Sequence, residues 1–341
     1  MLSFAAAKTA AETPVNGPAQ LAFDSAGDLY ISEYFGHKII KIDFNTGIVS
    51  VVAGNGRECC YEENRDSKKV SVYQVESLAV DNRGNVYFGG RNARDGAFVR
   101  KIDNGLHHII TLAGSLSARS PASASGSSPL EINVSDPKGL VTKPSGALLV
   151  STDQSNQIVQ IDSTAKTLVG GALDPDLFKL PGSLAQDKNG NILVADYLHH
   201  CIKRVDAQSH VVTTVAGNGS TKESGDGGEA VKAGIPYPVS IAVSSTGDIY
   251  VLENSNHRIR RIDANTGIIK TIAGTGEAGF TTDGIQASIA KISPVAIALD
   301  SQDNLYFSEI DNNRVRRIDR SSGILTTVAG NGLPKRKIRL E

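Results

Sequence analysis

Acidic side chains recur at one place in this 341-residue chain, after a short apolar segment that appears in several similar units. Carboxylate oxygens bind divalent cations such as calcium, and paired carboxylates can act as general acid and base. A structural role is the alternative, because a carboxylate before a turn accepts backbone N–H bonds and recurs in any structural repeat. The candidate cation ligands are Glu33, Asp153, Asp196, Glu253 and Glu309, with Arg91 near the equivalent place in the second unit.

A second candidate site lies where the repeat is broken. Most units begin with Pro, whereas the second begins with Val75-Glu76-Ser77, and the third has Lys138 directly after its Pro. A structural rule that fails in one unit requires a local reason. We expect Glu76 and Lys138 to project together, as an ion pair at a ligand site or as a simple surface salt bridge. The predicted ligand-binding residues are Glu76, Lys138, Gln20, Ser183, Ser240 and Arg91.

The histidines do not have the spacing of a zinc site. His37, His200 and His257 occupy one repeat position in three different units, where Asn156 and Asn313 stand in two others. Ligands of a single zinc ion must converge within a few ångströms, which three separate units do not allow. We therefore expect this position to hold a turn.

These residues are carried by six copies of one unit, each with four short apolar segments. In the fifth copy the later segments contain Gly247–Tyr250, Arg261–Asp263 and Ile272–Gly274. A period of roughly 45 to 60 residues is typical of propellers and arrays. Segments such as 191–195 are apolar without alternation, which predicts sheets buried on both faces. The sequence therefore predicts an all-β fold, a six-bladed β-propeller with four antiparallel strands per blade and the first strand lining the channel.

We expect a single propeller domain over residues 1–341, with 1–17 as a linker remnant. The predicted blades are approximately 18–56, 75–115, 137–171, 181–219, 238–276 and 294–332. Long connections between them should wall the channel mouth, since binding sites are usually built from loops on a rigid scaffold. The chain ends fit a domain excised from a larger extracellular or periplasmic protein, although the sequence does not determine localisation.

The units resemble the NHL-repeat family, most closely over 240–274 and 295–330. Residues 256–263 are similar to the family's third-strand segment, and 225–238 to the linker of bacterial-type NHL arrays. The resemblance implies the propeller fold. It does not imply one function, because NHL propellers include protein-binding scaffolds, RNA binders, sensor domains and a few lyases.

The sequence favours a binding or interaction scaffold, a monomeric domain without catalysis, whose ligand site lies at the channel mouth under the long inter-blade loops. Its partner would be a protein or a small polar ligand, and it needs no cofactor. The first alternative is a lyase or hydrolase of a small polar substrate, using the channel carboxylates and a divalent cation such as calcium. The second is RNA binding by basic third strands, which a net charge of −1 and sparse aromatic residues disfavour. No apolar run approaches the length of about 18 residues that a membrane span needs.

Overall fold

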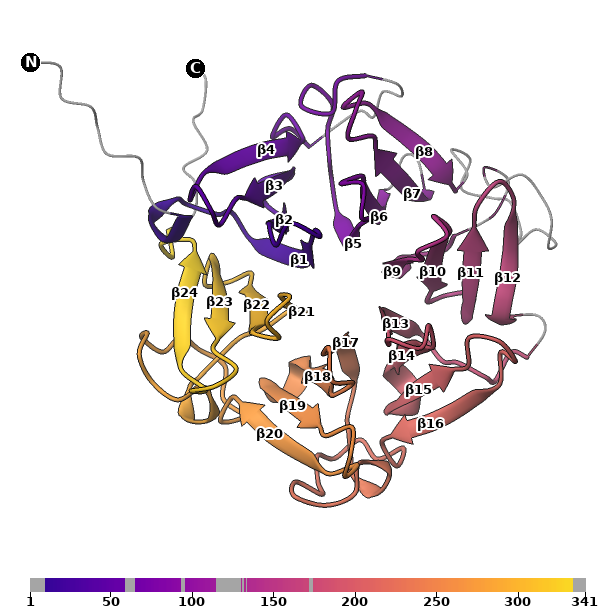
Figure 1. The fold of residues 1–341 in the computed structure, drawn as a ribbon, viewed down its shortest axis with the longest axis vertical. Helices are drawn as coiled ribbons and strands as arrows, with labels where there is room; N and C mark the ends of the chain where they lie inside the picture. Colours follow the sequence, from indigo (N-terminus) through magenta and orange to yellow (C-terminus); the bar gives the residue numbers. More distant parts are fainter. Residues whose placement is uncertain are drawn as a thin grey trace, which may run out of the picture.

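The computed structural model describes residues 10–58, 65–92, 96–114, 130, 132, 134–171 and 174–333. In this part of the chain, six four-stranded antiparallel sheets form blades around a central channel (Figure 1). Every sheet is a meander of four strands consecutive in sequence. The predicted all-β, six-bladed propeller is confirmed.

The first three blades hold strands β1 to β12. Their bounds are β1 (Pro18–Phe23), β2 (Leu29–Glu33), β3 (Lys38–Ile42) and β4 (Val49–Ala53) in the first blade, β5 (Val75–Val80), β6 (Val86–Asn92), β7 (Gly96–Ile102) and β8 (Ile109–Ala113) in the second, and β9 (Pro137–Thr142), β10 (Leu148–Thr152), β11 (Gln157–Ile161) and β12 (Ala165–Gly170) in the third.

The last three blades hold strands β13 to β24 and most of the short 3-10 helices. Their strands are β13 (Pro181–Gln186), β14 (Ile192–Asp196), β15 (Cys201–Val205), β16 (Val212–Ala216), β17 (Pro238–Val243), β18 (Ile249–Glu253), β19 (Arg258–Ile262), β20 (Ile269–Ala273), β21 (Ala296–Leu299), β22 (Leu305–Glu309), β23 (Arg314–Ile318) and β24 (Leu325–Ala329). The 3-10 helices are η1 (Ala10–Glu12), η4 (Tyr197–His199), η5 (Ala230–Lys232), η6 (Asn254–Asn256) and η7 (Ala287–Ile289).

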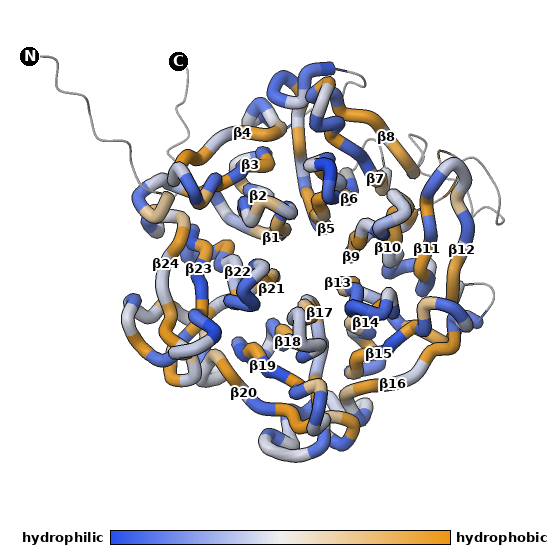
Figure 2. Tube along the Cα trace, viewed as in Figure 1, coloured by the Kyte–Doolittle hydropathy of each residue, from blue (hydrophilic) through white to orange (hydrophobic). Residues whose placement is uncertain are grey.

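The hydrophobic core is divided among the spaces between blades. Strands β2, β10, β14 and β22 are buried along their whole length, which explains their unbroken apolar runs. Leu29 and Ile31 of the first blade, for example, pack with Tyr306 and Val315 of the last. Hydrophobic residues accordingly recur in every blade of the ring (Figure 2).

The repeat position shared by histidine and asparagine holds a turn, as predicted. All five residues adopt the left-handed backbone conformation, with φ between 48° and 53°. Asn156 Oδ1 accepts the N–H of Leu180 and Asn313 Oδ1 accepts that of Gly17, both at 2.9 Å. Because Leu180 and Gly17 directly precede first strands, these side chains fix where the next blade enters the channel. The five residues are His37, Asn156, His200, His257 and Asn313.

The ring closes by side-chain and terminal contacts without exchange of a strand. β1 to β4 come from one end of the described chain and β21 to β24 from the other. Ser308 in β22 donates to the carbonyl of Ala19 in β1, and the Gly330 N–H donates to the carbonyl of Ala10 in η1. Residues 10–17 therefore lie against the junction of the first and last blades.

The described parts of the long connections lie against the outer strands. Glu229 forms an isolated antiparallel bridge with Ile268, and Gln286 forms one with Ile324. These partners directly precede the outermost strands β20 and β24, and the loops extend from the periphery of the ring (Figure 1). The expectation that these connections wall the channel mouth is therefore wrong for them. Much of two further connections, at 59–64 and 115–129, lies outside the described residues.

Candidate functional site

The strand registers separate Asp153 from the other four predicted cation ligands. The Pro that opens a blade pairs with Glu33 in the first blade, with Asp196 in the fourth and with Glu253 in the fifth. In the third blade the corresponding partner of Pro137 is Thr152. Asp153 is one residue further along, at the position that follows the second strand. That position is held by Tyr34, Asp153, Tyr197, Asn254 and Ile310, and in the second blade by Arg91, which lies within the longer β6.

The remaining four carboxylates are buried, and three of them bind the chain just before a first strand. The backbone N–H of Asn16 donates to Glu33 Oε1 at 2.9 Å, and that of Lys179 donates to Asp196 Oδ1 at 2.8 Å. Ser293 N–H donates to Glu309 Oε1 at 2.8 Å in the last blade. This is the structural alternative considered from the sequence, since a carboxylate is satisfied locally by backbone donors.

Basic side chains of the third strand neutralise three of these carboxylates. Arg260 Nη1 lies 3.3 Å from Glu253 Oε1, and both side chains are 0% exposed. Arg316 Nη1 lies 3.5 Å from Glu309 Oε2, and Lys203 Nζ lies 2.8 Å from Asp196 Oδ2. Burial raises the pKa of Glu253, although Asn256 and Arg260 oppose it. Such pairs are part of the fold, because either charge alone would be costly to bury.

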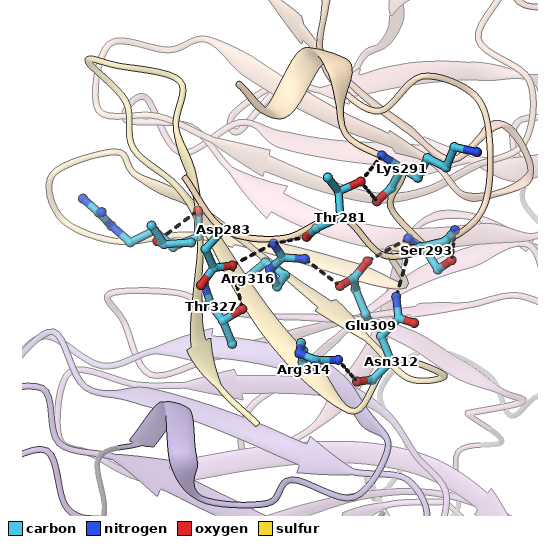
Figure 3. A network of polar contacts seen from close by, with 12 residues as sticks. Thr281, Asp283, Lys291, Ser293, Glu309, Asn312, Arg314, Arg316 and Thr327 are labelled. Atoms are coloured by element: carbon cyan, nitrogen blue, oxygen red, sulfur yellow. Dashed lines mark hydrogen bonds and ion pairs between the residues drawn. The ribbon is translucent and has the colours of Figure 1, made fainter. Parts of the chain in front are cut away.

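The same arginines attach the long connections to the blades. Arg316 Nη2 donates to the carbonyl of Thr281 at 2.9 Å and to Asp283 Oδ1 at 3.0 Å (Figure 3). Asp283 Oδ2 in turn accepts the backbone N–H of Thr327 in β24 at 2.9 Å. Arg260 repeats the pattern in the fifth blade by donating to the carbonyls of Gly234 and Ser224. Arginines buried in this way cannot contact RNA.

The predicted cation site is not assembled in the structure. Within the described residues, no three His, Cys, Asp or Glu side chains come together in a way that could hold a metal ion. Glu33, Asp196, Glu253 and Glu309 each bind inside their own part of the ring. The same residues contain no helix long and apolar enough to cross a membrane.

All six blades contribute instead to one cavity of about 380 Å³ at the channel mouth. Two rings of repeat positions line it, one from the second residue of each blade and one from the residue after each second strand. The first ring is Ala19, Glu76, Lys138, Gly182, Val239 and Val295, and the second includes Tyr34, Asp153, Tyr197, Asn254 and Ile310.

The charged lining residues belong to the second and third blades. Lys138 Nζ lies 2.6 Å from Glu76 Oε2, and these two side chains are 35% and 27% exposed. Burial acts to lower the pKa of Lys138, but the Glu76, Asp153 and Asp136 carboxylates outweigh it and raise that pKa. The predicted ion pair between Glu76 and Lys138 is thus present, and it faces the cavity.

Asp153 is the least compensated charge of the mouth. Its Oδ1 is buried and has no hydrogen-bond donor among the described residues. Burial, with the nearby Asp136 carboxylate, raises the pKa of Asp153 to about 6, against the opposing effect of Lys138. Asp136 itself is occupied, because its Oδ2 accepts from Arg91 Nη1 at 3.1 Å and from Gln154 Nε2 at 2.7 Å.

The structure divides the predicted ligand-binding residues into three groups. Gln20, Glu76 and Lys138 line the mouth. Ser183 and Ser240 lie deeper along the channel, where their Oγ atoms accept the N–H groups of Ile241 and Ile297 from the next blade. Arg91 is absent from the lining, and its side chain is 55% exposed beside Asp136.

Sequence reasoning missed the tyrosines and misplaced the aspartate. Tyr34 and Tyr197 were findable, because each directly follows a predicted second strand. Asp153 was grouped with the buried acids that end the second strands. In the third blade Thr152 occupies that position, and Asp153 is the next residue. Counting from the opening Pro of each blade would have given the correct register.

Comparisons with known proteins agree with this architecture. Residues 216–282 match the teneurin NHL domain family. Human NHL repeat-containing protein 2 is 26% identical over 304 residues, which is 76% of this chain and 41% of that protein. Chicken teneurin-1 is also 26% identical, over 90% of this chain and 11% of its own length. The chain thus spans less than half the length of either relative.

Solved structures share the fold at low identity. A virginiamycin B lyase from Staphylococcus aureus is 17% identical with a TM-score of 0.52, covering 92% of this chain and 84% of that one. An auxiliary nutrient binding protein from Bacteroides thetaiotaomicron is 18% identical with a TM-score of 0.63, covering 92% and 70%. The fold and its cavity define a six-bladed propeller with an axial mouth. The matched segment and the similar relatives support an NHL-repeat propeller.

Proposed function

We propose that this NHL propeller is a binding module whose ligand site is the cavity at the channel mouth. The observation that carries the proposal is the uneven lining. Glu76, Lys138 and Asp153 stand on two neighbouring blades, whereas Val239, Val295 and Ile310 stand on the other side of the ring. A concave site with an apolar wall and a few convergent polar groups is typical of ligand pockets. The ligand is a small polar molecule or a protein segment that enters the mouth.

Catalysis is the weaker candidate and rests on one group. Asp153, with its pKa raised to about 6, is suited to proton transfer near neutral pH. A solved lyase has the same fold, but that likeness concerns the fold alone. A lyase or hydrolase at this mouth would also need a second acid or base, and Glu76 is engaged by Lys138.

A cavity-filling variant tests the binding proposal. The Cβ that Gly182→Leu adds meets ordinary neighbours at 3.5 Å, and the longer side chain should occupy space in the mouth without replacing a charged residue. We expect members of a panel of amino acids, amines and short peptides to raise the melting temperature of the native protein. Gly182→Leu should abolish those shifts. Gly105→Leu, in the exposed turn between β7 and β8, is the matched control and should keep them.

The outcome that contradicts the proposal is equally specific. Ligand-induced shifts that survive Gly182→Leu would place binding elsewhere on the propeller. A panel that shifts neither protein, followed by crystal soaks that leave the mouth empty, would remove the site altogether.

A further inference from the structure

We infer that the channel mouth takes a primary alkylammonium group, such as a lysine side chain or a small amine, with Asp153 as its counter-ion. This inference rests on the proposed function and specifies its ligand. The argument combines the charge balance of the mouth, the state of the Asp153 carboxylate and the apolar wall that faces it.

The charge balance leaves one negative charge over. Lys138 is neutralised by Glu76 at 2.6 Å, and Asp136 by Arg91 at 3.1 Å. Asp153 has no ion-pair partner of its own among the described residues. A single added positive charge would therefore balance these groups at the mouth, whereas an anion would face two carboxylates and would have to displace Glu76 from Lys138.

The Asp153 carboxylate lacks the donors that a buried charge requires. Its Oδ1 has no hydrogen-bond partner in the described chain, and the Gln154 backbone N–H offsets burial only in part. An ammonium carries three donors, which is the chemistry needed by an under-satisfied carboxylate. A divalent cation is a poorer fit, since it prefers six or more oxygen ligands and the described residues bring no three carboxylates together.

The rest of the cavity suits an alkyl chain that carries such a charge. Tyr34 and Tyr197 line the mouth from the blades on either side of the charged pair, and an aromatic ring attracts an ammonium placed over its face. Val239, Val295 and Ile310 form the wall across the ring and would cover the methylene groups. The pocket is therefore polar at one end and apolar at the other, as an alkylammonium is.

Binding should depend on pH through Asp153. The charged and titratable groups around it are Glu76, Lys138 and Asp136, with Tyr34 and Tyr197 in the same lining. An ammonium binds the ionised carboxylate, so protonation of Asp153 opposes it. With a pKa of about 6, the affinity should fall about tenfold from pH 7.5 to pH 5.

A lysine series tests the inference on the whole chain. The probes are Nα-acetyl-lysine methylamide, its Nε-acetylated form and the norleucine equivalent, titrated by NMR. We expect the lysine probe to bind at least tenfold more tightly than either uncharged analogue. Asp153→Asn should remove that preference, whereas Asp311→Asn should not, because Asp311 is an exposed carboxylate that directly follows Ile310 and is absent from the cavity lining. The native circular dichroism spectrum of Asp153→Asn controls for folding.

Two further probes distinguish a protein lysine from a small free amine as the natural ligand. A pentapeptide with a central lysine that binds more than tenfold tighter than n-pentylamine indicates a protein partner, and equal affinities indicate a small amine. Both results support the inference. Three results would overturn it. They are equal affinity for the lysine and norleucine probes, undiminished amine binding by Asp153→Asn, and no saturation of the native protein at about 50 mM amine, a concentration near the weakest affinity that still defines a site. If the inference fails but Gly182→Leu still blocks the binding of uncharged ligands, the mouth remains the ligand site of the proposed function, and only the preference for an ammonium group is wrong.

Discussion

Two sets of charged side chains in this propeller differ in what surrounds them. The first set, inside the blades, pairs Glu253 with Arg260 and Glu309 with Arg316, and all four side chains are 0% exposed. The second set, at the mouth, contains the part-exposed Glu76–Lys138 pair and Asp153. Pairs of the inner kind occur in the fourth, fifth and sixth blades, whereas the mouth residues occur once. The charged positions that repeat have a structural role, whereas the charged residues that interrupt the repeat form the candidate site.

The largest effect should come from breaking an inner pair. Arg316→Met leaves Glu309 buried without its cation and removes the donors to Thr281 and Asp283. We expect a loss of about 3–5 kcal/mol in the free energy of unfolding, measured by urea denaturation. The double variant with Glu309→Gln should recover part of it. A loss below about 1 kcal/mol would mean that the inner pairs are as dispensable as surface ones.

Two glycines, one at the end of a blade and one at the mouth, allow the same comparison for the backbone. Gly274 ends the fifth blade at φ +91°, where an added Cβ would collide with the carbonyl of His257. Gly274→Ala should cost about 2–3 kcal/mol, since both the conformation and the space are unfavourable. Gly182→Ala, at the mouth, has ordinary contacts and should stay within about 0.5 kcal/mol. Similar melting temperatures for the two variants would contradict this contrast.

Asp153 should make the protein's stability depend on pH in a direction opposite to that of most acidic residues. Its pKa is raised to about 6 in the folded state, so its contribution is fully present below the unfolded value near 4 and is lost as pH rises through about 6. After allowance for its partial exposure, we expect the native protein to lose about 1–2 kcal/mol relative to Asp153→Asn between pH 4 and pH 7.5. Parallel stability curves for the two proteins would show that Asp153 is adequately compensated.

Substitutions in the Glu76–Lys138 pair should have the smallest effects on stability. The two substitutions should change the affinity for the lysine probe in opposite directions. Glu76→Gln and Lys138→Met should each change the free energy of unfolding by less than about 1 kcal/mol, because the pair is part-exposed. Glu76→Gln leaves Lys138 unpaired and should weaken binding of the lysine probe several-fold. Lys138→Met removes a positive charge and should strengthen it. Changes in the same direction would show that the pair acts as one positioning unit.

The sequence determined the architecture because the strand and turn signals of each blade lie close together in the chain. Unbroken apolar strands and Gly or Asn in turns recur along the chain, and the basic–apolar–Asp motif recurs in five of the six units, so the fold is over-determined even where one copy departs. The Glu76–Lys138 pair was predictable for the same reason, since a break is visible only against a regular background. The turn role of His257 and its counterparts was also readable from repetition.

Only the tertiary structure decided which residues share the mouth. Counting from Pro137 gives the register of Thr152 and Asp153, but only the folded ring shows that Thr152 is buried inside and that Asp153 lines the cavity. Likewise, buried Arg260 and Arg316 draw the long connections to the rim of the ring. Neither outcome follows from one unit alone, because the burial of a charge depends on neighbours contributed by segments tens of residues away.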